Sequence, residues 1–82
     1  MDKTEAIGIV NEVLKGCSCF IDASHVSITD SSAQVRVKTT GYEVNIKCYP
    51  NDDIRECLEP ILAKHQLKTA EFTEAIIIYK PA

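Results

Sequence analysis

Two short segments on either side of Gly41 alternate polar and apolar side chains along the chain. They are Gln34–Thr39 and Glu43–Tyr49. Alternation of this kind is typical of antiparallel strands that bury one face and leave the other in water. Thr40 and Gly41 suit the turn between them, because glycine adopts a positive φ without steric cost. We therefore predict a β-hairpin, which restricts the chain to folds built on a sheet with one polar face.

The alternation also assigns the hairpin's side chains to its two faces. The apolar set, predicted to point into the core, is Val35, Val37, Val44, Ile46 and Cys48. The set predicted to face water is Gln34, Arg36, Lys38, Asn45, Lys47 and Tyr49. The polar face of the sheet therefore combines basic residues with an aromatic ring.

An amphipathic helix is predicted before the hairpin, over Thr4–Lys15. Asp2 suits its N-cap, and Gly16 suits its end because glycine tolerates the left-handed conformation there. Apolar residues recur at helical spacing, and the stripe they form is Ile7, Val10, Val13, Leu14 and Cys17, widened by Ile9.

A second helix is predicted after Pro50, where Asn51 or Asp52 can serve as the N-cap. Its apolar stripe is Ile54, Cys57, Leu58, Ile61, Leu62 and His65. Pro60 lies inside this stripe, where it removes a backbone donor and crowds the preceding turn. We therefore expect a kink or a break near Glu59.

Two further strands are predicted, one before the hairpin and one near the end of the chain. The first covers His25–Thr29 and places Val26 and Ile28 inward. The last covers Ala75–Lys80 and is apolar on both faces. Ile76 and Ile78 then belong to the core, while Ile77 and Tyr79 emerge on the face that the hairpin keeps polar.

These elements follow one another in the order α-β-β-β-α-β. We expect a single domain of 82 residues with an α+β fold of two layers, a mainly antiparallel four-stranded sheet with two helices on one face. A right-handed crossover through the second helix would place the last strand beside the first and parallel to it.

The composition excludes several classes of protein. The net charge of −3 gives no reason to expect strong nonspecific affinity for nucleic acid. No apolar run approaches the length that a membrane span needs, and the acidic start of the chain does not resemble a signal peptide. We therefore expect a cytoplasmic protein that does not enter a membrane.

Four cysteines stand at positions 17, 19, 48 and 57. We expect reduced thiols, because Cys48 and Cys57 fall on core faces and nothing marks secretion. The alternative is a metal or sulfur role that begins at Cys17 and Cys19. One residue between two cysteines is fewer than zinc sites usually have, so we expect no metal and no cofactor.

No arrangement of residues in the sequence resembles a catalytic site. No sequence motif places a nucleophile or an orienting carboxylate near His25 or His65, as a catalytic histidine requires. The chain's few glycines are far apart, so no phosphate-binding loop is present. We expect no catalytic residues and no enzymatic activity.

The stretch from Val35 to Ile61 resembles the hairpin and helix of a ubiquitin-like β-grasp. The shared pattern is Val37 to Gly41, the apolar alternation that follows, and then Pro50, Asp52, Ile54 and Ile61. The resemblance implies a module that binds other proteins through its sheet, and it carries no catalytic role. The chain departs from that family in beginning with a helix and in ending Lys80-Pro81-Ala82 without a Gly-Gly tail.

The leading functional prediction is a small protein-interaction module that acts through its open sheet face and pairs with another protein or with itself. An apolar strand on a polar face is normally covered by a partner. The alternative is a protein that binds single-stranded nucleic acid, because basic residues can contact its phosphates while aromatic residues on the same face stack on its bases. The acidic stretch Asn51-Asp52-Asp53 is unlike the basic helix start of a double-stranded-RNA-binding domain. The candidate binding residues are Arg36, Lys38, Lys47, Tyr49, Ile77 and Tyr79.

Overall fold

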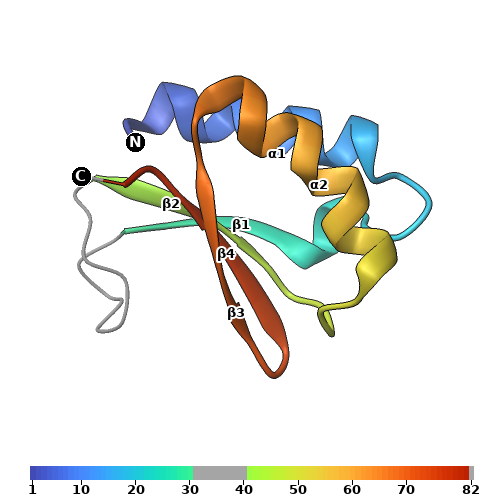
Figure 1. The fold of residues 1–82 in the computed structure, drawn as a ribbon. Helices are drawn as coiled ribbons and strands as arrows, with labels where there is room; N and C mark the ends of the chain where they lie inside the picture. Colours follow the sequence, from blue (N-terminus) through green and yellow to red (C-terminus); the bar gives the residue numbers. More distant parts are fainter. Residues whose placement is uncertain (31–40, 82) are drawn as a thin grey trace.

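A computed structural model describes residues 1–30 and 41–81 of the chain. Two helices, α1 (Lys3–Gly16) and α2 (Asp52–His65), cover one face of a four-stranded antiparallel sheet (Figure 1). The strands are β1 (Val26–Asp30), β2 (Tyr42–Ile46), β3 (Lys68–Phe72) and β4 (Ala75–Tyr79), and a short 3-10 helix, η1 (Ala23–His25), precedes β1. The predicted α+β fold class is confirmed.

The strands lie in the order β1-β2-β4-β3, and every pair of neighbours is antiparallel. The prediction that the last strand lies beside the first is therefore wrong, because β2 lies between β1 and β4, although these two strands do run in the same direction. The reason is β3, a strand that the sequence did not reveal. It follows α2 at the sheet's edge and turns back, so that β4 enters antiparallel to β2. The predicted strand Gln34–Thr39, with Val35 and Val37, lies outside the described residues.

Helix α1 begins as predicted but is rotated relative to its predicted stripe. The Asp2 carboxylate accepts a hydrogen bond from the Glu5 backbone at 2.8 Å and caps the first turn. The residues buried on its inner face are Ala6, Ile9, Val13 and Cys17. Ile7 is 48% exposed, so its assignment to the core is wrong. Ala6, Ile9 and Val13 together form the face that packs inward, and Ile7 lies outside that face.

Helix α2 has the predicted cap and the predicted inner face. The Asn51 side chain accepts a hydrogen bond from the Ile54 backbone at 3.0 Å. Ile54, Leu58 and Ile61 are buried. The helix continues through Pro60 without the break that we expected. Pro60 and Glu56 are both exposed, so water can bond the backbone carbonyl of Glu56 that Pro60 leaves without a donor.

The two faces of the sheet differ in what they bury. On the face under the helices, Val44, Ile46, Ile76 and Ile78 belong to the core, as predicted. On the opposite face the strand register sets Asn45 beside Ile77. Ile77 is only 2% exposed and Glu43 is fully buried. The face that the sequence predicts to be open therefore buries both an isoleucine and a carboxyl group.

No helix in residues 1–30 and 41–81 is long and apolar enough to cross a membrane.

Candidate functional site

An open groove of about 780 Å³ lies at the end of the sheet where β1 begins and β2 ends. Its walls come from four segments: the turn after α1, η1, the link from β2 into α2, and the β3–β4 turn. The described residues that line it are Phe20, Ser24, His25, Lys47, Cys48, Tyr49, Asn51, Ile54 and Glu74. Two of the predicted binding residues, Lys47 and Tyr49, thus meet here.

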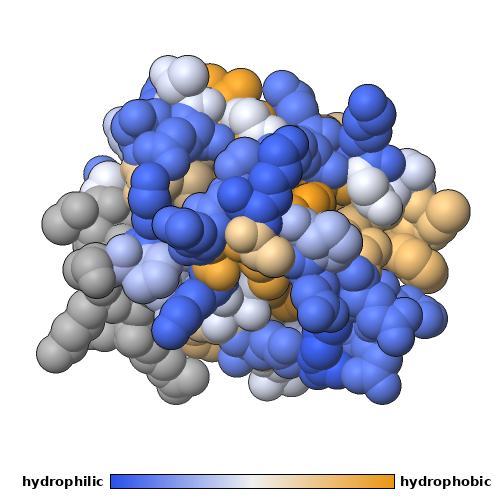
Figure 2. All heavy atoms as spheres, turned by 45° about the horizontal axis from the view of Figure 1, so that its top comes forward, coloured by the Kyte–Doolittle hydropathy of each residue, from blue (hydrophilic) through white to orange (hydrophobic). Residues whose placement is uncertain are grey.

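Phe20 forms one side of the groove from the turn that ends α1. The Cys17 carbonyl accepts hydrogen bonds from the backbone of Phe20 at 3.0 Å and of Ile21 at 2.9 Å, which closes this turn. Ile21 is buried and anchors the turn, while the Phe20 ring is 48% exposed. Figure 2 shows apolar residues gathered at the right-hand edge of the molecule, where this turn lies in Figure 1.

Tyr49 lines the same groove from the link between β2 and α2. It is 69% exposed, more than any other large apolar or aromatic side chain in the described part of the chain. Its hydroxyl donates a hydrogen bond to Glu74 at 3.1 Å, which ties the ring to the β3–β4 turn. An aromatic ring held by its polar end presents its apolar body to a ligand at little cost in conformational entropy.

The polar part of the groove is built around η1. Asp22 caps η1 by accepting hydrogen bonds from the backbone and the hydroxyl of Ser24, and these bonds lower the pKa of Asp22. The His25 Nδ1 atom accepts from the Asp22 backbone at 3.3 Å. The His25 carbonyl in turn accepts from the Lys47 backbone at 2.7 Å, which joins η1 to the end of β2.

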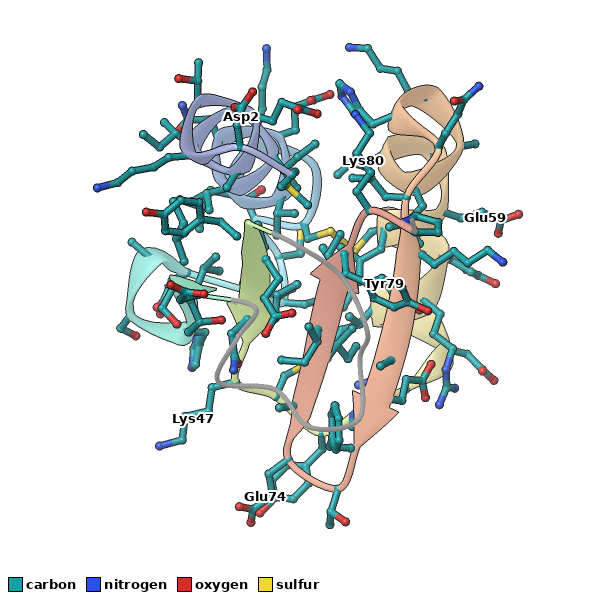
Figure 3. All side chains as sticks on the ribbon, turned by 90° about the vertical axis from the view of Figure 1, so that its left-hand side faces the viewer. Asp2, Lys47, Glu59, Glu74, Tyr79 and Lys80 are labelled. Carbon is teal, nitrogen blue, oxygen red and sulfur yellow. A yellow bond between two sulfur atoms is a disulfide. The ribbon has the colours of Figure 1, made fainter. Side chains whose placement is uncertain are left out.

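Lys47 supplies a cation to this wall of the groove. Its side chain extends into solvent away from the end of β2, and Glu74 lies at the β3–β4 turn (Figure 3). Lys47 makes no ion pair with another described residue. Its ammonium group is therefore free to meet a ligand.

Cys48 lies at the floor of the groove with a free, half-buried thiol. Burial raises the pKa of this thiol, and the nearby negative charge of Glu71 raises it further. The thiol therefore stays protonated at neutral pH, and a protonated thiol is a poor nucleophile. Cys48 contributes an apolar contact surface to the groove.

The remaining predicted binding residues do not line this groove. Ile77 and Tyr79 lie on the sheet face opposite the helices, where Tyr79 is half-buried and Ile77 offers almost no surface to a partner. Arg36 and Lys38 lie outside the described residues. The structure therefore separates the predicted site into a groove at the sheet's end and a largely covered sheet face.

The cysteines do not all stay reduced as expected. Cys17 and Cys57 form a disulfide with their Cα atoms 5.6 Å apart, and it lies between the two helices above the sheet (Figure 3). The prediction of reduced thiols is wrong for this pair. Both residues stand on the inner stripes of their helices, and the packing of α1 on α2 brings them together. Cys19 is free and exposed.

Residues 1–30 and 41–81 contain no group of three or more His, Cys, Asp or Glu side chains arranged to hold a metal ion. Cys17 is occupied by the disulfide and does not offer a thiolate alongside Cys19. His65 contacts Glu12 at 2.5 Å and lies at the far end of α2. Of the two histidines and the two free cysteines, His25 and Cys48 line the groove, while His65 and Cys19 do not.

Sequence reasoning missed Phe20, Asn51 and Glu74 as parts of a site. Phe20 lies between Cys17 and Ala23, in a segment without apolar periodicity. The signal that could have identified it is that it is an aromatic residue outside any predicted apolar stripe. Asn51 has a structural role as the cap of α2. Glu74 belongs to a turn next to a strand that the sequence did not reveal.

No protein-family model matches this chain, and no curated protein or solved structure shows significant similarity to it.

Proposed function

We propose that the protein is a non-enzymatic interaction module that binds a segment of another protein in the groove between Phe20 and Tyr49. The observation that carries this proposal is that two exposed aromatic side chains, from segments far apart in the sequence, line one groove. Exposed aromatic residues around a pocket are the usual energetic centres of protein interfaces. The sheet face predicted from the sequence is replaced in this proposal, because Ile77 is buried.

The charges around the groove favour a protein segment with basic residues over nucleic acid. Glu74 lines the groove, and Asp22 before η1 and Asp53 in the first turn of α2 lie within two residues of lining residues in the chain. Acidic groups therefore outnumber the one described lysine that lines the groove, Lys47. They would repel phosphate groups and attract lysine or arginine. The partner that fits is an extended segment with an apolar side chain between basic residues, its apolar group between the two rings.

The test is a binding series with short fluorescein-labelled peptides in which a leucine or tryptophan stands between lysines. Fluorescence polarisation measures their affinity for the wild type and for Phe20→Ala and Tyr49→Ala. Removing either ring should weaken binding by roughly tenfold or more, since truncated hot-spot residues cost about 2 kcal/mol.

The matched control is Ile7→Ala. Ile7 is 48% exposed, the same fraction as Phe20, but it lies on the outer face of α1 away from the groove. This variant should bind like the wild type. Equal losses in Ile7→Ala and Phe20→Ala would contradict the proposal, and so would tighter binding of a single-stranded oligonucleotide than of any peptide.

Self-association through Ile77 and Tyr79 stays a prediction from the sequence, as does the ubiquitin-like resemblance. Light scattering over a range of concentrations tests self-association in the same preparations. If the protein is a dimer that Tyr79→Ser dissociates but Tyr49→Ala leaves intact, the binding surface is the sheet face and not the groove.

The cytoplasmic location also stays a prediction. The Cys17–Cys57 disulfide weighs against it, because disulfides persist chiefly in oxidising compartments and are transient in the cytosol. Alkylation of free thiols with a maleimide in intact cells, followed by mass spectrometry, shows whether Cys17 and Cys57 are paired there.

A further inference from the structure

A series of contacts joins the C-terminal end of α1 to α2 and ends at the groove. Glu12 contacts His65 and also pairs with Lys64 at 3.3 Å. One turn further along α1, a side-chain carbon on Gly16 would lie 3.6 Å from Ile61, so the helices pack closely there. The helices therefore run antiparallel along this seam, and the next link is the Cys17–Cys57 disulfide.

The disulfide is the last of these links before the groove. Cys17 opens the turn that carries Phe20 and accepts both hydrogen bonds that close it. Cys57 lies one helical turn after Ile54, which lines the groove from α2. The disulfide thus covalently connects the wall that carries Phe20 to the wall that carries Ile54.

We propose that the Cys17–Cys57 disulfide is a thiol-exchange site that controls the groove. With the bond closed, the Phe20 turn is held against α2 and the groove is formed. With the bond open, the turn keeps its two hydrogen bonds to the Cys17 carbonyl, the hydrogen bond from the Cys17 amide to Val13 and the packing of Ile21. It loses its covalent link to α2, so Phe20 moves and the groove loses affinity. This inference rests on the proposed function for its consequence, but the change in the turn can be measured without a ligand.

The reductant is a small dithiol, and its point of attack follows from burial. Cys57 is half-buried, whereas Cys17 is almost fully buried. A thiolate of the dithiol attacks the sulfur of Cys57, the bond between the two cysteine sulfurs breaks, and the Cys17 thiolate leaves and takes a proton from water. The second thiol of the reductant then displaces Cys57 as a thiol, and the reductant becomes a cyclic disulfide.

The salt bridges of Glu12 and the packing of Gly16 on Ile61 do not depend on the disulfide. They lie further from the groove and hold α1 on α2 when the bond opens. The change should therefore be confined to the turn and the nearby wall of α2. A local opening of this kind is detectable by hydrogen exchange, because exchange reports the opening of individual hydrogen bonds.

The experiment compares amide exchange by NMR in the wild type with and without dithiothreitol. We expect the amides of Phe20 and Ile21 to exchange at least about tenfold faster after reduction, while Ile9 and Val13 in α1 keep their protection. Peptide affinity should fall by a similar factor. Unchanged exchange at Phe20 and Ile21 would overturn the proposal, and loss of protection throughout α1 would overturn it as well, because the bond would then be purely structural.

Two variants separate the disulfide from other effects of the reductant. Cys57→Ser should resemble the reduced wild type and be insensitive to dithiothreitol. Cys19→Ser removes an exposed free thiol in the same turn and should keep the full difference between the two redox states. If Cys57→Ser does not fold, far-UV circular dichroism of the reduced wild type shows whether the native helices remain. If no peptide binds either form, the proposed function fails while the exchange difference still decides this inference.

Discussion

The buried carboxyl group of Glu43 gives the sharpest prediction about stability. Glu43 is fully buried on β2, and its Oε1 atom accepts a hydrogen bond from the Thr29 hydroxyl at 3.3 Å. Its Oε2 atom has no hydrogen-bond partner among the described residues. Burial raises the pKa of this carboxyl above the usual value of 4.5 and the charge of Asp30 adds to the rise, while the Thr29 bond and the N-terminal charge oppose it.

The raised pKa sets the sign of the pH dependence. The folded protein holds the Glu43 proton at pH values where the unfolded chain has released it. The contribution of Glu43 to the free energy of unfolding is therefore fully present below pH 4.5 and is lost as the pH rises through the folded-state pKa. Near neutral pH the folded state contains either a buried charge or a proton bound at a cost.

Glu43→Gln removes the charge and keeps the shape and the bond from Thr29. The amide that Glu43→Gln introduces is still a buried polar group, but an unpaired buried group costs more when it is charged, so we expect the variant to gain about 1–3 kcal/mol at neutral pH. In a domain of this size that gain raises Tm by roughly 4–8 °C for each kcal/mol. Below the usual glutamate pKa the variant and the wild type should be equally stable, because both side chains are then neutral.

Urea denaturation followed by circular dichroism, at neutral and at acid pH, measures this difference. Glu56→Gln is the matched control, because it removes the same charge from an exposed position on α2. It should give no pH-dependent gain. A Glu43→Gln variant that is less stable than the wild type at neutral pH, or whose gain persists unchanged in acid, would refute the reasoning.

Four further predictions concern stability alone. Cys57→Ser should lower the free energy of unfolding by about 4 kcal/mol, the chain-entropy value for a crosslink between residues 40 apart, and adding a reductant should destabilise the wild type equally but leave the variant unchanged. Gly41→Ala should cost more than about 1 kcal/mol, because φ is +84° and a Cβ would lie 2.4 Å from the Met1 carbonyl oxygen. Gly8→Ala, where nothing lies within 4 Å, should instead stabilise by about 1 kcal/mol. Asn51→Ala should cost about 1 kcal/mol by removing the cap of α2, measured by thermal denaturation; an unchanged Tm would contradict this assignment.

The parts of the fold that follow from local patterns could be predicted from the sequence. The apolar periodicity and the caps at Asp2 and Asn51 predicted both helices, and the alternation predicted the two faces of β2. Strand β3 could not be found in this way, because Lys68–Phe72 lies at the edge of the sheet and lacks an apolar alternation. The position of Ile7 outside the inward face of α1 depends on how the helix packs, which is a tertiary effect.

The candidate site was harder to predict than the fold, because it is assembled from separate segments. Lys47 and Tyr49 were singled out by the alternation of the predicted strand Glu43–Tyr49, but β2 ends at Ile46, so both lie beyond the strand and not on its polar face. Phe20 and Glu74 reach the same groove through a turn and a hairpin whose positions are set by packing. The disulfide likewise depends on the contact between α1 and α2, which no local pattern in the chain contains.

An NMR titration with the lysine-flanked apolar peptide follows the aromatic ring resonances of the protein as the groove fills. Binding between the two rings predicts that the signals of Phe20 and Tyr49 shift together and saturate at the same peptide concentration, while Tyr79 on the sheet face stays unchanged. Shifts confined to Tyr79, or a Phe20 signal that does not respond while Tyr49 does, would contradict a binding site between these rings.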